Sequence, residues 1–197
     1  MYLLLHTGIN LLASAIALIP ALLLLNHFQF RNLRLTGMYL LLSLYLSALW
    51  LVTGLPTILC RTFEPTFYLL PVIGMADDVR NSILNCILFL PLGFLLPLIW
   101  TKYRKWGVTV LFGFFLSLAV ELMQIFTYRL TDVNDLITNT VGTALGFLLA
   151  RPLLSKRQGH DVSHAFPVVA VTACAIFFIQ PLVSGLLWKL IPSDLSN

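Results

Sequence analysis

The sequence predicts an all-α, polytopic transmembrane helical bundle of about six helices. Of its 197 residues, 59% are apolar and only 10% are charged, whereas about 25% of the residues of an ordinary soluble domain are charged. A membrane-spanning helix needs about 20 mostly apolar residues. Apolar stretches of that length recur along the whole chain, and the connectors between them are short. We therefore expect a single membrane domain over residues 1–197.

Six stretches are long and apolar enough to span a bilayer. They cover roughly residues 3–25, 38–56, 82–100, 107–126, 136–154 and 166–188. The first contains no lysine or arginine and is too long for a secretory signal peptide, so we expect it to be a permanent helix. The sixth is interrupted by Gln180 and Pro181, and proline removes a backbone donor and crowds the preceding turn. We expect this last segment to be kinked or only partly inserted.

The distribution of lysine and arginine sets the predicted orientation. Eight of the twelve basic residues follow the first, third and fifth stretches: Arg31, Arg34, Lys102, Arg104, Lys105, Arg151, Lys156 and Arg157. Short loops rich in these residues stay in the cytoplasm. The sequence therefore predicts a multi-pass protein of the cytoplasmic membrane with both termini outside the cytoplasm. The net charge of +4 fits these loops and anionic lipid, and nothing indicates binding of nucleic acid.

Three of the predicted helices carry polar side chains toward their extracytoplasmic ends. The residues recur at spacings of three or four, which places them on one helical face. They are Asp78, Asn81 and Asn85 in the third stretch, Ser117, Glu121 and Gln124 in the fourth, and Asp135 and Asn139 in the fifth. Lipid cannot satisfy such groups, and a charge at this depth is costly. We therefore expect the three faces to turn toward one another and to line an outward-facing polar cavity.

The connector at residues 127–134 belongs to the same constellation, because it carries Arg129 and Asp132 and joins two of the polar faces. Arg129 could neutralise nearby carboxylates or hold an anion. The whole set could instead be a hydrogen-bond network that only fixes helix packing. The candidate ligand-binding residues are Asp78, Asn81, Asn85, Glu121, Gln124, Arg129, Asp132, Asp135 and Asn139.

Two further features concern packing around this region. Gly142 and Gly146 have the small-xxx-small spacing that lets a second helix approach closely, and we expect the fourth and fifth stretches to form a tight hairpin there. An apolar patch at residues 66–75 is too short to span. We expect it in the outer interface, or folded back as a cover over the cavity.

Four fragments in this region resemble the VanZ-like membrane protein family. They are Asn85-x-x-x-Phe89-x-Pro91-x-Gly93, Glu121-x-x-Gln124, Arg129-x-x-Asp132-x-x-Asp135 and Asn139-x-x-Gly142-x-x-x-Gly146. Their joint order and spacing cover a core of about residues 77–150. The resemblance implies a small polytopic protein of the bacterial cell envelope, from a family whose namesake is associated with resistance to glycopeptide antibiotics of the teicoplanin type. It implies no biochemical mechanism.

Two function classes remain open. A binding protein would use the cavity to hold a membrane lipid headgroup or a lipid-linked cell-wall precursor, with Arg129 facing a phosphate. A metal-assisted membrane enzyme would hold a divalent cation and act on a phospholipid or lipid-linked substrate. Its cation ligands would be the carboxylates of Asp78, Glu121, Asp132 and Asp135. No nucleophile lies beside a base and no phosphate-cradling glycine loop is present, so we assign no catalytic residue, metal ligand or cofactor. A proton-coupled carrier is a weaker third possibility, because a buried Glu121 could hold a proton.

Overall fold

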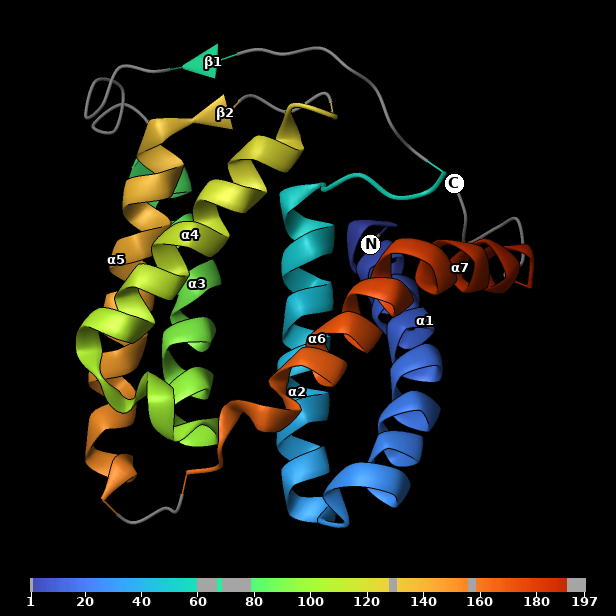
Figure 1. The fold of residues 1–197 in the computed structure, drawn as a ribbon. Helices are drawn as coiled ribbons and strands as arrows, with labels where there is room; N and C mark the ends of the chain where they lie inside the picture. Colours follow the sequence, from blue (N-terminus) through green and yellow to red (C-terminus); the bar gives the residue numbers. More distant parts are fainter. Residues whose placement is uncertain (1, 60–66, 69–78, 128–130, 156–158, 191–197) are drawn as a thin grey trace. The chain divides into compact units, whose positions relative to one another are not determined.

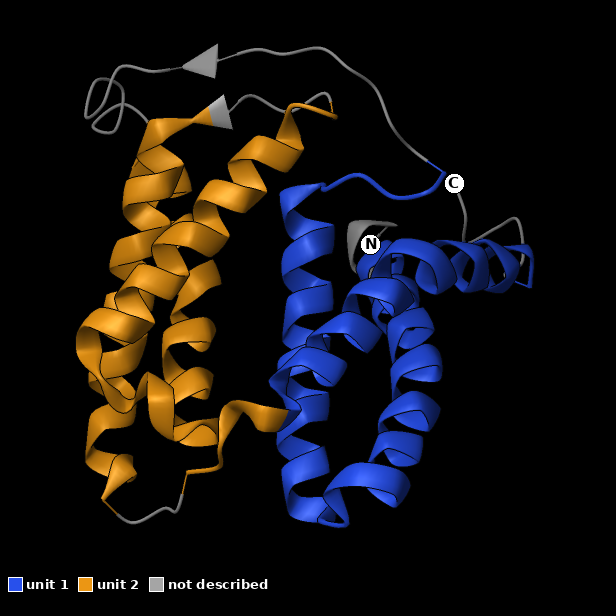
Figure 2. Ribbon diagram, viewed as in Figure 1, with its two compact units in different colours: residues 1–61, 164–197 blue, residues 62–163 orange. Residues whose placement is uncertain are grey.

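The computed structural model shows an almost entirely helical chain that divides into two compact units (Figures 1 and 2). It describes residues 2–59, 67–68, 79–127, 131–155 and 159–190. Unit 1 comprises Met1–Arg61 and His164–Asn197, and unit 2 comprises Thr62–Ser163. Within the described residues, six helical runs are long and apolar enough to cross a membrane: Leu5–Phe30, Leu33–Thr53, Val79–Ile99, Trp106–Gln124, Val133–Leu154 and Val162–Lys189. The predicted all-α polytopic fold is confirmed.

Unit 1 is built from α1 (Tyr2–Leu25), α2 (Leu33–Thr53), α6 (Ala165–Cys174) and α7 (Gln180–Lys189). The short turn from α1 to α2 contains Arg31 in the left-handed region, with φ of 47°. Asn32 then caps α2, because its side chain accepts a hydrogen bond from the Leu35 N–H at 3.1 Å.

The beginning of α1 and the end of α7 lie together in unit 1. The rings of His6, in the second turn of α1, and Trp188, near the end of α7, have centroids 5.9 Å apart. This contact shows that α1 and α7 pack against each other at this end of unit 1. The side of the membrane that the termini face stays a prediction.

The last helical run changes type where the sequence predicts an interruption. A π-helical segment, η4 (Ala175–Ile179), separates α6 from α7. Pro181 lies in the first turn of α7, where its missing N–H costs no hydrogen bond. The kink expected at Gln180 is therefore achieved by one wide π turn, a device that often occurs at functional positions.

Unit 2 is built from α3 (Val79–Ile99), α4 (Trp106–Gln124) and α5 (Val133–Leu154). A 3-10 turn, η2 (Thr101–Arg104), connects α3 to α4. Two short strands, β1 (Phe67–Tyr68) and β2 (Thr131–Asp132), pair in parallel beside the beginning of α5, with Tyr68 opposite Asp132. Part of the apolar patch at 66–75 therefore lies against the connector before α5, while its remaining residues are outside the described part of the chain.

The glycines of α5 pack against α3, which corrects the predicted packing against α4. A Cβ atom on Gly142 would lie 2.1 Å from the carbonyl oxygen of Cys86, and one on Gly146 would lie 2.0 Å from that of Leu90. Gly93 of α3 makes the same kind of close contact in the other direction. A Cβ atom added to it would lie 1.9 Å from the backbone oxygen of Thr143. Both helices thus bring their backbones into contact, and the pairs 86–142 and 90–146 show that α3 and α5 run parallel.

Candidate functional site

One face of α4 carries three deeply buried polar side chains. Ser117, Glu121 and Gln124 are 0%, 3% and 4% exposed. Their spacing of four and three residues predicts a common face, and their burial confirms that this face is turned inward. In an apolar helix such burial requires partners within the protein, because lipid offers none.

Two hydrogen bonds join this face of α4 to α5. The Nδ2 atom of Asn139 donates to the Ser117 hydroxyl at 2.9 Å. The backbone N–H of Asp132 donates to Glu121 Oε2, also at 2.9 Å. The buried carboxylate therefore holds the chain at the point where α5 begins, and two of the predicted polar faces do meet.

Asp132 itself is the N-cap of α5. Its Oδ1 atom accepts a hydrogen bond from the Asn134 N–H at 2.8 Å. Asp132-x-x-Asp135 has the spacing of a capping box, in which the third helical residue would bond back to the N-cap N–H. Here Glu121 of α4 takes that N–H instead. One role of Asp132 is thus structural, and its carboxylate is partly engaged within the fold.

Two amide groups of the cluster have a buried atom with no hydrogen-bond partner among the described residues. These atoms are Asn85 Nδ2, a donor, and Asn139 Oδ1, an acceptor. Asn85 adjoins Cys86, and Asn139 lies one turn before Gly142, so the contact between Cys86 and Gly142 places both amides at about the same level of the helix pair. A buried donor on α3 and a buried acceptor on α5 therefore lie at about the same level, and Asn139 also contacts α4 through Ser117.

The remaining predicted site residues are dispersed. Asp135 is half-buried in the first turn of α5, and Asn81 is exposed near the beginning of α3. Asp78 and Arg129 lie outside the described residues. Within the described part of the chain, no group of three or more histidine, cysteine or acidic side chains is arranged to hold a metal ion.

Sequence reasoning left four buried polar residues out of the candidate set. Ser117, Asn134, Thr138 and Thr143 are all less than 9% exposed. The two threonines donate to the carbonyls four residues earlier, Thr138 to Asn134 at 3.0 Å and Thr143 to Asn139 at 3.1 Å. The sequence did contain a signal for the residues of α5, because polar residues recur there at a spacing of four and extend the polar face of that helix.

Comparison with known proteins identifies the family. The VanZ/LLP1 family matches residues 5–156. Protein VanZ of Enterococcus faecium is 41% identical over 75 residues, which are 36% of this chain and 45% of that relative. The matched part thus spans less than half of the relative's length. No solved structure matches this chain. The match over residues 5–156, together with the six apolar helices, confirms the resemblance found in the sequence: the chain is an integral membrane protein of the VanZ/LLP1 family.

Proposed function

We propose that this protein binds the polar part of a lipid-linked molecule at a polar cluster in unit 2, formed by α3, α4 and the beginning of α5. The observation that carries the proposal is the pair of buried amide atoms, Asn85 Nδ2 and Asn139 Oδ1, for which the described residues offer no partner. Leaving such an atom unsatisfied costs about 1–3 kcal/mol. A ligand that supplies an acceptor to one amide and a donor to the other recovers this energy.

The chemistry of the cluster favours a ligand with hydroxyl or amide groups. Amide side chains both donate and accept, and the Glu121 carboxylate, when ionised, only accepts. Sugars and peptides offer matching groups, and both occur in lipid-linked cell-wall precursors. The location within membrane helices favours a ligand that is itself anchored in lipid, since a headgroup then needs to move only laterally to reach the site.

The family supports a role in the bacterial cell envelope. The E. faecium relative is itself called Protein VanZ. The sequence resemblance implies that the family's namesake is associated with resistance to glycopeptide antibiotics. A site that binds a cell-wall precursor would be one way to connect this cluster to that association with teicoplanin resistance. The basic connectors favour a cytoplasmic-membrane protein whose cluster and termini face outward.

The enzyme alternative has less support from the geometry. Asp132 uses its carboxylate to cap α5, and Glu121 accepts the hydrogen bond of the Asp132 N–H. Both acidic groups are thus partly occupied in holding the fold together. Of the other two carboxylates of that hypothesis, Asp135 is half-buried in the first turn of α5 and Asp78 lies outside the described residues. No specific observation favours catalysis over binding.

The substitution Asn85→Leu tests the proposal. Leucine has nearly the size of asparagine, and Asn85 Nδ2 has no partner among the described residues, so we expect an unchanged or higher melting temperature. Native mass spectrometry of protein extracted in lipid nanodiscs should show that the wild type retains a lipid-linked species and that Asn85→Leu loses it. Ile87→Val, on an exposed position of α3, is the control. Equal retention by all three proteins, or no retained species in the wild type, would refute the proposal.

A further inference from the structure

Unit 1 contains a second group of buried polar side chains, separate from the cluster of unit 2. His6, Asn10 and Ser14 recur every four residues along α1 and therefore share one face. Asn10 and Ser14 are only 7% and 3% exposed. A row of three polar residues in an otherwise apolar first helix is costly in a membrane and is usually functional.

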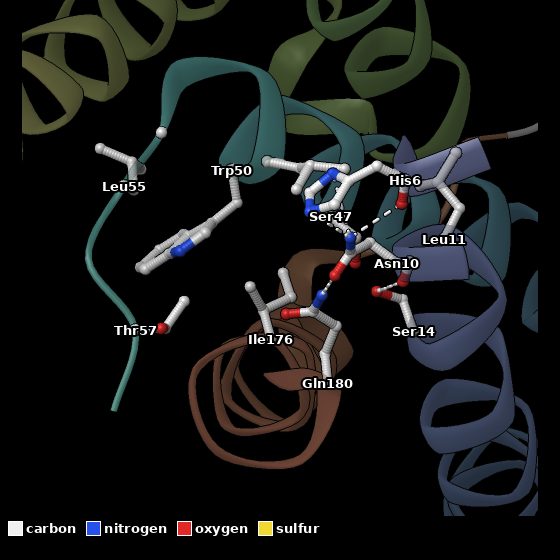
Figure 3. A pocket seen from close by; sticks show the side chains of 12 residues that line it. His6, Asn10, Leu11, Ser14, Ser47, Trp50, Leu55, Thr57, Ile176 and Gln180 are labelled. Carbon is white, nitrogen blue, oxygen red and sulfur yellow. Dashed lines mark hydrogen bonds between the residues drawn. The ribbon is translucent and has the colours of Figure 1, made fainter. Parts of the chain in front are cut away.

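This row meets the π-helical kink of the last helical run. Gln180, 8% exposed, donates from Nε2 to Asn10 Oδ1. Asn10 in turn donates from Nδ2 to the His6 carbonyl at 2.8 Å. The wide turn before Gln180 thus places its amide against α1, and residues 170 positions apart in the sequence form one hydrogen-bonded chain (Figure 3).

A cavity of about 370 Å³ adjoins this chain of hydrogen bonds. In Figure 3, Trp50 and Thr57 line one side, Asn10 and Ser14 line the other, and Gln180 lies between them. The volume falls within the range of about 300–1,000 Å³ that is usual for small-molecule sites.

Two polar atoms of this cavity are available to a ligand. Trp50 Nε1, an obligate donor, is buried and has no hydrogen-bond partner among the described residues. The Oε1 atom of Gln180, an acceptor, points to the side of the cavity on which Trp50 lies (Figure 3). A buried indole N–H normally finds a partner, so its lack of one within the described chain indicates that the partner comes from elsewhere.

The lining specifies an uncharged ligand. Its described residues include no aspartate, glutamate, lysine or arginine, and His6 is the single titratable side chain among them. The other lining side chains either carry an amide, a hydroxyl or an indole, or belong to leucine and isoleucine. This mixture suits a molecule with a hydrogen-bonding rim and an apolar face, which is the character of a sugar ring.

The cavity runs from a helix end into the membrane. Leu55 and Thr57 follow the end of α2 at Thr53. Ser14 lies eight residues beyond His6, or about 12 Å along α1 at 1.5 Å per residue. We infer that this cavity binds a single uncharged sugar ring, which enters from the membrane surface either as the headgroup of a glycolipid or as a free sugar.

The experiment compares Trp50→Phe with the wild type in phosphatidylglycerol nanodiscs. The probes are monoglucosyl diacylglycerol, included in the nanodisc lipid, and free glucose or N-acetylglucosamine, added to the solution. Binding is followed by isothermal titration calorimetry and by the melting temperature, neither of which depends on the tryptophan that is replaced. Loss of one hydrogen bond of about 1.4 kcal/mol corresponds to a tenfold weaker affinity. We expect Trp50→Phe to lose about tenfold in affinity while its melting temperature without sugar stays unchanged, because the N–H has no partner within the described protein to lose.

Two further variants keep the test decisive. Trp106→Phe removes an indole that does not line the cavity and should bind as the wild type does. Thr57→Val removes a lining hydroxyl outside the helices, and it replaces Trp50→Phe as the test variant if that protein does not fold. Binding of the glucolipid alone assigns a lipid headgroup, and binding of free sugar as well shows that the ring suffices. The inference is overturned if neither probe binds, or if the cavity variant binds both probes as tightly as the wild type does.

Discussion

The substitution Gly142→Ala should destabilise unit 2 by forcing α3 and α5 apart. The added Cβ would lie 2.1 Å from the carbonyl oxygen of Cys86, whereas real Cβ atoms essentially never approach another heavy atom closer than 3.0 Å. The obstructing atom belongs to a helix backbone and cannot turn aside as a side chain would. Gly146 and Gly93 make equally close contacts along the same interface, so a local shift would disturb them too. Overpacking of this kind costs about 1–3 kcal/mol.

Gly37→Ala in α2 is the matched control, because a Cβ there would meet nothing within 4 Å. At such an open helical position alanine is favoured over glycine by about 0.5–1 kcal/mol. The two variants should therefore shift the melting temperature in detergent in opposite directions, Gly142→Ala downward and Gly37→Ala upward or not at all. A Gly142→Ala protein that melts at or above the wild-type temperature would show that α3 and α5 do not pack through this glycine.

Three further predictions follow from the site and the topology. Asp132→Ala should lower stability by about 1 kcal/mol through loss of the N-cap bond to Asn134, whereas Asp132→Asn keeps an accepting oxygen and should melt within a degree or two of the wild type; equal losses would contradict the capping role. A double-mutant cycle of Ser117→Ala and Asn139→Ala should give a coupling of about 0.6 kcal/mol, typical of a hydrogen bond between membrane helices, and additive effects would argue against that bond. Reporter fusions should place a site after Lys102 in the cytoplasm and a site after Asp132 outside it, and fusions that report the same side would disprove the predicted orientation.

The polar faces were readable from the sequence because helix geometry is local. Residues three or four apart share a face, so the burial of Ser117, Glu121 and Gln124 followed from spacing alone. The start of α5 was also visible in principle, because aspartate, here Asp132, is among the residues preferred at an N-cap. The spacing of residues along one helix cannot show which other helix packs against its polar face.

The packing of α5 shows this limit. The spacing of Gly142 and Gly146 predicts that some helix approaches closely, but it does not say which one. The sequence neighbour α4 was the expected partner, yet the backbone contacts are made by α3. Gly93 was the missing clue, because a small residue on α3 allows contact from both sides. Gln180 illustrates the same limit, since the sequence predicts the interruption at this residue but not its hydrogen bond to Asn10, far away in the sequence.

The most direct test of the account measures binding of a lipid-linked cell-wall precursor to the wild type and to Glu121→Gln in nanodiscs, alongside the melting temperature of each. Glutamine keeps an oxygen that can accept from the Asp132 N–H but carries no charge. The account predicts saturable binding by the wild type and at least a tenfold loss in Glu121→Gln, with melting temperatures that agree within a few degrees. Lower stability with unchanged binding, or no saturable binding by the wild type, would show that the polar cluster only holds the helices together.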